Sequence, residues 1–380
     1  MSLTGTPFFV TAIVLAVVAV LLPLALWSRV RGPALVRGGA RLLMVGFAQV
    51  TALLVVFVAV NNSNGLYGSW EDLLGTGDHV AAAADLGRDG MGGVRFADLP
   101  ASRQTFRPAD DPNVGPDVRV TEFDGHVSGV RGEVHVWLPP QYDDPAYRNT
   151  KFPVVELLPG YPGSSRAWFT SLRVHEQLKP LMERGEVAPF ILVSPRTTLL
   201  GGGLDTGCAN APGKINADSW LSVDVRKMVM DSLRASQRPG GWAVAGYSAG
   251  GHCAAKLAVA HPDRYRAGVS LSGYNDPAAE KASIAAYDPE LRRANNPLTL
   301  LESAPVPPRT ALYVSGARGD GFEAGLALRA AAKPPTKVDV IEVGGAHDTE
   351  GWRLQIPDVF RWLTRQIGVE GGPTASAAAR

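Results

Sequence analysis

The residues with the strongest chemical signature lie in one segment, AVAGYSAGGHCAAKLAV. It contains a GxSxG motif that runs from Gly246 to Gly250, with Ser248 at its centre. A β-rich apolar run precedes the motif and a helical run follows it, so the two glycines permit a tight strand-to-helix turn that exposes the serine hydroxyl. Ala249 begins the helix, and its backbone N–H points to where an oxyanion would form. We therefore predict Ser248 as a nucleophile and Ala249 as one oxyanion donor.

A serine hydroxyl needs a general base, and the usual chain order after such a turn is serine, acid, histidine. His347 lies in VGGAHDTEGW, directly after the last predicted strand, where a loop can carry it over Ser248. His252 is too close to the turn, and His261, in AVAHPDRY, is expected to cap the end of the helix that follows Ser248. We predict His347 as the base.

The acid that orients His347 is expected at the end of the preceding strand, in the segment YVSGARGDGFE. Asp320 comes first after the strand and stands among glycines, which suit a tight loop. Glu323 begins a helical stretch, where an acidic residue is also favoured by the helix dipole. We predict Asp320 as the acid and keep Glu323 as the alternative.

A second oxyanion donor is expected in the loop after an early strand, LLPGYPGSSRAW. Pro159 has no N–H, so the donor is Gly160, Tyr161 or a later residue. We choose Tyr161. Taken alone, this segment is equally consistent with an ordinary Gly/Pro turn.

These loops need a framework of alternating strands and helices. Several short apolar runs have the composition of strands buried on both faces, and amphipathic stretches such as 219–235 and 323–332 lie between them. This alternation predicts an α/β fold with a mostly parallel sheet flanked by helices. The candidate strands are 133–138, 153–158, 190–194, 242–246, 267–272, 310–315 and 337–343.

Four separated blocks resemble the putative-esterase family of α/β-hydrolases: VHVWLPPQY, FPVVELLPGYPGSSRAW, AGYSAGGHCAAKLAVAHPDRYRAGVSLSG and GGAHDTEGWRLQIPDVFRWL. That family includes S-formylglutathione hydrolases, feruloyl and enterochelin esterases, and mycobacterial mycolyltransferases. The resemblance covers about residues 118–366. It implies an α/β-hydrolase fold, Ser248 as nucleophile, His347 as base and an acid from the 318–323 loop.

Two details of the resemblance bear on the site and on location. The mycolyltransferases use a glutamate as the acid, which keeps Glu323 open, and they are secreted rather than anchored by helices. The LDTGCANAP stretch, with Asp205 and Cys208, looks like a loop of actinobacterial members that carry membrane helices.

Residues 1–60 contain two apolar runs of membrane-spanning length, 8–27 and 42–60. A cleaved signal peptide is disfavoured because residues 1–7 carry no charged side chain and the first apolar run is too long. The connector contains Arg29, Arg31, Arg37 and Arg41, and the positive-inside rule places it in the cytoplasm. We therefore expect two transmembrane helices in the cell membrane, with the rest of the chain extracytoplasmic.

An extracytoplasmic location favours a disulfide between Cys208 and Cys253. Neither cysteine belongs to a CxxC motif or a Cys/His cluster, so no metal site is expected, and no cofactor. The net charge of +1 gives no sign of nucleic-acid binding.

The chain thus divides into an anchor (1–60), a juxtamembrane spacer with little regular structure (61–117), a catalytic domain (118–366) and a disordered tail (367–380). We expect an esterase or acyltransferase that acts through an acyl-Ser248 intermediate on a small-molecule, lipid or glycan ester. The sequence does not choose between water and a hydroxyl as acyl acceptor. The alternatives are an inactive membrane-tethered binding protein on a hydrolase fold, or a serine peptidase.

Overall fold

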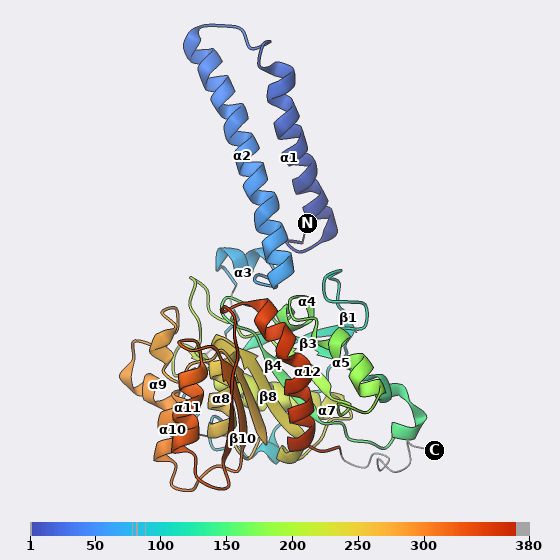
Figure 1. Ribbon diagram of the computed structural model, residues 1–380, viewed down its shortest axis with the longest axis vertical. Helices are drawn as coiled ribbons and strands as arrows, with labels where there is room; N and C mark the ends of the chain where they lie inside the picture. Colours follow the sequence, from blue (N-terminus) through green and yellow to red (C-terminus); the bar gives the residue numbers. More distant parts are fainter. Residues whose placement is uncertain (1, 78, 81–82, 88, 370–380) are drawn as a thin grey trace.

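The computed structural model describes residues 2–369 apart from 78, 81–82 and 88, and it contains a helical hairpin standing on an α/β unit (Figure 1). The main sheet begins with a two-residue edge strand at Arg107–Pro108, and its other strands follow from Arg119 onward. Most of the predicted tail lies outside the described residues, because 370–380 are not among them.

The hairpin consists of α1 (Thr6–Leu26) and α2 (Ala34–Asn64). Both helices are long and apolar enough to cross a membrane, and most of their apolar side chains are exposed. They are therefore candidate transmembrane spans. The second helix begins at Ala34, well before the expected residue 42, because a helix once started continues through the Arg- and Gly-containing turns that precede the apolar run.

The main sheet has nine strands in the order β1-β2-β3-β5-β4-β8-β9-β10-β11. Neighbours from β5 to β11 in this order are parallel, whereas β1, β2 and β3 pair antiparallel and β3 joins β5 antiparallel. The mostly parallel sheet predicted from the sequence is confirmed. The strands are β1 (Arg107–Pro108), β2 (Arg119–Asp124), β3 (Arg131–Trp137), β4 (Val154–Leu158), β5 (Ile191–Pro195), β8 (Trp242–Tyr247), β9 (Ala267–Leu271), β10 (Ala311–Gly316) and β11 (Lys337–Glu342); β6 (Asn210–Ala211) and β7 (Ile215–Asn216) form a separate hairpin.

All seven predicted strands are present, with ends that differ by at most two residues. The two missed strands of the main sheet, β1 and β2, lie at its edge. The first is fully exposed and the second alternates between exposed and buried residues, so neither has the continuous apolar run that marked the central strands.

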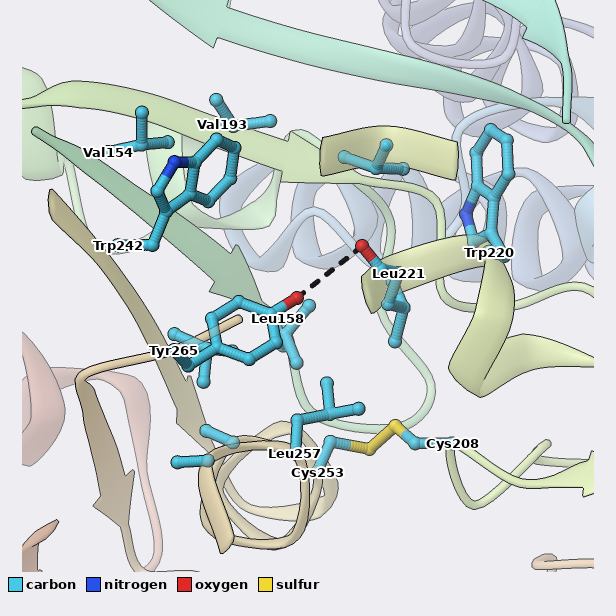
Figure 2. Close-up of a cluster of buried hydrophobic side chains, with 14 of the residues drawn as sticks. Val154, Leu158, Val193, Cys208, Trp220, Leu221, Trp242, Cys253, Leu257 and Tyr265 are labelled. Atoms are coloured by element: carbon cyan, nitrogen blue, oxygen red, sulfur yellow. Dashed lines mark hydrogen bonds between the residues drawn. A yellow bond between two sulfur atoms is a disulfide. The ribbon is translucent and has the colours of Figure 1, made fainter. Parts of the chain in front are cut away.

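Helices cover both faces of the sheet. One face packs against α7 (Arg226–Ser232), α8 (Ala249–Ala260), α10 (Pro297–Ser303) and α11 (Phe322–Ala331), and Figure 2 shows Trp242, Tyr265 and Leu257 in this layer. The other face packs against α4 (Ala167–Thr170), α5 (Val174–Glu183) and α12 (Thr349–Gln366). The remaining helices are α3 (Trp70–Leu74), α6 (Ala217–Ser219), which continues into a π-helical segment at Trp220–Val225, and α9 (Pro289–Ala294).

The described residues of 61–117 have little regular structure but are tied to the domain. Asp72, in α3, forms an ion pair with Arg196, and Asp111 forms one with Arg166. The Ser102 N–H donates to the Asp231 carboxylate at 2.8 Å. The segment, which we call the collar, is thus packed on the domain that contains the sheet.

Candidate active site

Ser248 occupies a strained turn between β8 and α8. Its backbone has φ 56° and ψ −125°, an unusual conformation for a residue with a side chain. A Cβ on Gly246 would lie 2.0 Å from the Gly250 carbonyl oxygen, and one on Gly250 would lie 2.2 Å from the Leu158 carbonyl oxygen. Both glycines of the motif are therefore required by close backbone contacts, and the turn presents the hydroxyl at the carboxyl end of the sheet.

His347 lies in the loop between β11 and α12 and connects Ser248 to Asp320. Its Nε2 is 2.9 Å from the Ser248 Oγ, and its Nδ1 is 2.7 Å from the Asp320 Oδ1. An ionised carboxylate can only accept, so the Nδ1–H donates to Asp320 and the Nε2 is left to accept from the serine. This arrangement can remove the serine proton as the oxygen attacks an acyl carbon.

The loop between β10 and α11 determines which acid reaches the histidine. A Cβ on Gly321, which has φ 90°, would lie 2.8 Å from the Ser272 Cα, so the loop passes close to the end of β9. Glu323, in the first turn of α11, accepts a hydrogen bond from the Gly319 N–H at 2.9 Å. Asp320 and not Glu323 is thus the hydrogen-bond partner of His347 in this structure.

Trp352, in the first turn of α12, packs against the imidazole ring of His347. The two rings meet edge to face with centroids 4.9 Å apart, and the indole N–H donates to the Ser272 hydroxyl at 3.0 Å. The other side of the indole stacks on Tyr247 at 4.5 Å. Trp352 was not predicted as a site residue from the sequence. The only signal was an aromatic residue five positions after His347, which is also ordinary for a buried helix face.

The two predicted oxyanion donors flank the serine. Ala249 is the first residue of α8, so its N–H has no partner within the helix. Tyr161 follows Gly160, where a Cβ would lie 3.1 Å from the Ser248 Cβ. Both backbone segments therefore run beside Ser248.

A polar group borders the Tyr161 side of the site. Burial raises the pKa of the Asp205 carboxyl to about 6, and one of its oxygens has no hydrogen-bond partner among the described residues. Burial, followed by the charge of Asp205, raises the pKa of the Tyr161 hydroxyl to about 12. The carboxyl group of Asp205, in the LDTGCANAP loop noted in the sequence, thus acts electrostatically on the Tyr161 hydroxyl.

The two other histidines near α8 are engaged elsewhere. Burial lowers the pKa of His252 to about 4, and its Nδ1 lies 2.9 Å from the Tyr274 carbonyl oxygen. His261 ends α8, and its Nε2 lies 2.8 Å from the Asp218 carboxylate. Burial alone would raise the pKa of Asp218, but His261 and Lys256 hold it well below its usual range.

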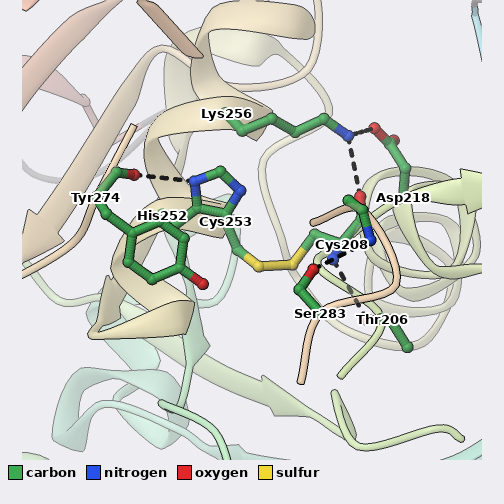
Figure 3. The surroundings of a disulfide bond; sticks show 9 residues. Thr206, Cys208, Asp218, His252, Cys253, Lys256, Tyr274 and Ser283 are labelled. Carbon is green, nitrogen blue, oxygen red and sulfur yellow. Dashed lines mark hydrogen bonds and ion pairs between the residues drawn. A yellow bond between two sulfur atoms is a disulfide. The ribbon is translucent and has the colours of Figure 1, made fainter. Parts of the chain in front are cut away.

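The predicted disulfide between Cys208 and Cys253 is present, with Cα atoms 5.7 Å apart (Figure 3). Cys253 lies in α8, one turn after Ser248, and the Lys256 ammonium donates to the Cys208 carbonyl oxygen at 3.0 Å. The bridge therefore fastens the Asp205 loop to the helix that begins at the serine. In the part of the chain that the structure describes, no group of three or more His, Cys, Asp or Glu residues is arranged to hold a metal ion.

Comparisons with known proteins identify the family of this chain. The profile of the family described as "Putative esterase" matches residues 127–363. An uncharacterised protein of Corynebacterium glutamicum is 25% identical over 299 residues, which cover 73% of this chain and 68% of that protein.

Solved structures share the fold at low identity. A ferulic acid esterase superposes with a TM-score of 0.55 at 20% identity, covering 66% of this chain and 98% of its own. The S-formylglutathione hydrolase of Agrobacterium tumefaciens also has a TM-score of 0.55, at 15% identity, covering 70% of this chain and 100% of its own. A fluorophosphonate-binding serine hydrolase of Staphylococcus aureus has a TM-score of 0.52 at 18% identity, covering 65% of this chain and 98% of its own. The α/β-hydrolase fold predicted from the sequence is confirmed.

Proposed function

Because this chain belongs to the putative-esterase family, we propose that it is a membrane-anchored serine hydrolase that cleaves or transfers acyl esters outside the cytoplasm. The observation that carries the proposal is the hydrogen-bonded series from Ser248 through His347 to Asp320, with distances of 2.9 and 2.7 Å. An inactive binding protein would have no need of this series, or of the strained backbone that exposes the serine.

In the proposed mechanism the Ser248 oxygen attacks the acyl carbonyl while His347 accepts the hydroxyl proton. Asp320 keeps the imidazole in the required tautomer and stabilises its positive charge. The backbone N–H groups of Ala249 and Tyr161 stabilise the oxyanion. The leaving alcohol departs with the proton from His347 and leaves an acyl group on Ser248.

The second half of the reaction transfers that acyl group to an acceptor. Water gives the free acid, and the hydroxyl of a sugar or a lipid gives a new ester. His347 removes the proton of either acceptor and returns it to Ser248 as the acyl group leaves. The substrate class is therefore an oxygen ester of a small molecule, a lipid or a glycan.

The hairpin supports anchoring in the cell membrane with the catalytic domain outside. The connector between α1 and α2 lies at the end of the hairpin farthest from the sheet (Figure 1), and Arg29 and Arg31 are in it. Arg37 and Arg41 follow in the first turns of α2. The positive-inside rule assigns this end to the cytoplasm and the opposite end to the catalytic domain. The disulfide is also typical of an oxidising compartment.

Labelling of the full-length protein with a fluorophosphonate probe tests the proposal. We expect the wild type to be labelled, and Ser248→Ala to abolish labelling without loss of fold, because the turn does not need the hydroxyl. His347→Ala is expected to abolish nearly all turnover. Labelling of Ser248→Ala at the wild-type rate would refute the assignment of the nucleophile.

The acid is tested by a matched pair of variants on a soluble ester. Asp320→Asn presents the wrong hydrogen-bonding group to the Nδ1–H, and in the serine-protease triad this change lowers kcat roughly 10⁴-fold. Glu323→Gln is the control, and we expect it to keep activity within a few fold. The reverse result would assign the acid to Glu323. Product analysis with and without a glycan acceptor then separates hydrolysis from transfer.

A further inference from the structure

The membrane hairpin ends directly on the loops of the candidate active site. α2 stops at Asn64, and the carbonyl oxygen of Gly65 accepts hydrogen bonds from the Ser164 N–H at 3.0 Å and the Ser164 hydroxyl at 2.5 Å. A Cβ on Gly65 would lie 2.8 Å from the Ala167 Cα. The helix end is thus packed backbone to backbone on the segment that continues from Gly160.

The same helix end is hydrogen-bonded to the collar and contacts the residues that follow His347. The buried Asn61 side chain bonds both the N–H and the carbonyl oxygen of Tyr67, at 2.8 and 3.1 Å. Arg166 donates to the same Tyr67 oxygen at 3.1 Å. On the other side, the Thr349 hydroxyl lies 3.5 Å from the Asn64 side-chain oxygen, two residues after His347. The last turn of α2 therefore lies between the segment that follows the oxyanion loop and the residues that follow His347.

The lengths of the apolar runs indicate where the end of α2 lies relative to the bilayer. The runs from Phe8 to Leu26 and from Leu42 to Val60 each span about 27 Å as helix, close to the hydrocarbon thickness of about 30 Å. Asn64 lies four residues past Val60, which is about 6 Å along the helix. The headgroup layer on each side of a bilayer is about 5–7 Å thick. The active-site loops are thereby placed at headgroup depth.

Side chains around the hairpin base have the composition of an interface. Phe8 and Trp70 meet with ring centroids 5.1 Å apart, and aromatic residues are enriched at this level of membrane proteins. Leu74 of α3 and Leu204, next to Asp205, are 69% and 45% exposed. The end of α3 lies against the segment that leads to Leu204, since a Cβ on Gly75 would lie 2.8 Å from the Gly202 nitrogen, and α3 itself lies beside the end of the hairpin in Figure 1.

From this placement we propose that the substrate is an acyl ester resident in the outer face of the membrane that holds the enzyme, that is, a lipid ester. The proposal rests on the proposed function, since it assigns a substrate class to the same serine. Ser248 reaches an ester carbonyl at the level of the headgroups, the C–O bond to the lipid's alcohol breaks, and the alcohol takes the serine proton through His347. The acyl chain stays against the membrane, so the lipid need not leave the bilayer.

The test uses full-length protein in phosphatidylcholine vesicles with a fluorogenic long-chain lipid ester. The ester is placed either in the same vesicles as the protein or in separate protein-free vesicles, and a soluble short-chain ester is measured in parallel. We expect the ester in the same vesicles to be cleaved at least about tenfold faster than the ester in separate vesicles, because a tethered enzyme acts at high effective concentration. Equal rates in the two arrangements would overturn the proposal.

A variant with an extended α2 tests whether the active site must lie close to the membrane surface. About fifteen residues of EAAAK repeats inserted between Asn64 and Gly65 extend α2 by about 22 Å as helix and raise the active site off the surface. A flexible Gly/Ser insertion of equal length is the control, since it allows the domain to return. We expect the rigid insertion to lower cleavage in the same vesicle about tenfold or more relative to the flexible one, while both keep soluble-ester cleavage.

The outcomes separate the two proposals. In one outcome, the variant with the rigid insertion cleaves the lipid ester in the same vesicles as fast as the variant with the flexible insertion does. If it does so while the soluble ester is cleaved and the fluorophosphonate probe labels the protein, the lipid substrate is refuted and the serine hydrolase assignment stands. Absence of both labelling and soluble-ester cleavage in the wild type would refute the proposed function itself. If an insertion impairs folding, seen as loss of soluble-ester cleavage, the comparison of same and separate vesicles with the wild type decides.

Discussion

The disulfide allows a quantitative prediction about stability. Cys208 and Cys253 are separated by 45 residues, and their side chains are buried, so the bridge closes a long loop inside the domain. The perturbation is removal of the cross-link, either by Cys208→Ala with Cys253→Ala or by a phosphine reductant. The reductant leaves every side-chain atom except the bond in place, which separates the cross-link from packing.

The expected magnitude follows from the loop length. Closing a loop of 45 residues removes about 13 cal/mol/K from the unfolded chain, or about 4 kcal/mol at 25 °C. A change of this size lowers Tm by about 8–16 °C in a domain of this class, at about 2–4 °C per kcal/mol. The Lys256 hydrogen bond to the Cys208 carbonyl survives both perturbations, so the loop is loosened rather than released.

The assay is thermal unfolding of the full-length protein in detergent, with and without reductant. Because the chain has two cysteines, the double variant must be insensitive to reductant, which provides the internal control. Rates of fluorophosphonate labelling report whether loosening the Asp205 loop reaches Ser248. A Tm unchanged by both perturbations, or two free thiols in protein taken from its native membrane, would refute the reasoning.

Three further predictions address charge and topology. Burial raises the pKa of Glu156 from 4.5 to about 8, so the folded state keeps a proton that the unfolded state releases, and stability should fall as pH rises between these values. The variant Glu156→Gln, which can still accept from the Tyr265 hydroxyl, should flatten this fall and raise Tm at pH 8.5. If stability declines with pH in the variant as it does in the wild type, Glu156 is not the source of the decline. Asp218→Asn should lower the free energy of unfolding by about 3–5 kcal/mol, because it leaves the buried Lys256 ammonium beside a neutral partner. The control is Asp263→Asn, at a largely exposed carboxylate, which should change the free energy of unfolding by less than about 0.5 kcal/mol. Alkaline phosphatase fused after residue 380 should be active, and a fluorescent protein that matures only in the cytosol should stay dark there; the opposite pair of results would reverse the topology.

The central strands were predictable because each is buried on both faces and therefore continuously apolar. Strands β1 and β2 were not, since β1 is only two exposed residues long and the exposed positions of β2 carry Arg119, Glu122 and Asp124, which interrupt any apolar run. The start of α2 was misplaced for a related reason. An apolar window marks what a membrane requires, and the helix itself extends beyond that window to Ala34.

The contacts of the collar were not predictable from its sequence. Its Gly, Asp and Asn residues have the composition of a spacer with little regular structure, and Asp72 and Asp111 in it are paired with Arg196 and Arg166. These partners are distant in sequence, so no local pattern indicates them.

The sequence by itself determined the types and order of the chemical groups. Ser248 stands in a motif with narrow steric requirements, and His347 and Asp320 each follow a recognisable strand, so chain order and strand position limited the choices to very few. Only the tertiary structure decided between Asp320 and Glu323 as the partner of His347, brought Trp352 against the imidazole, and seated α2 on the loops around Ser248. The physical reason is that strands and turns follow from neighbouring residues, whereas a hydrogen bond 2.7 Å long depends on where separate loops meet above the sheet.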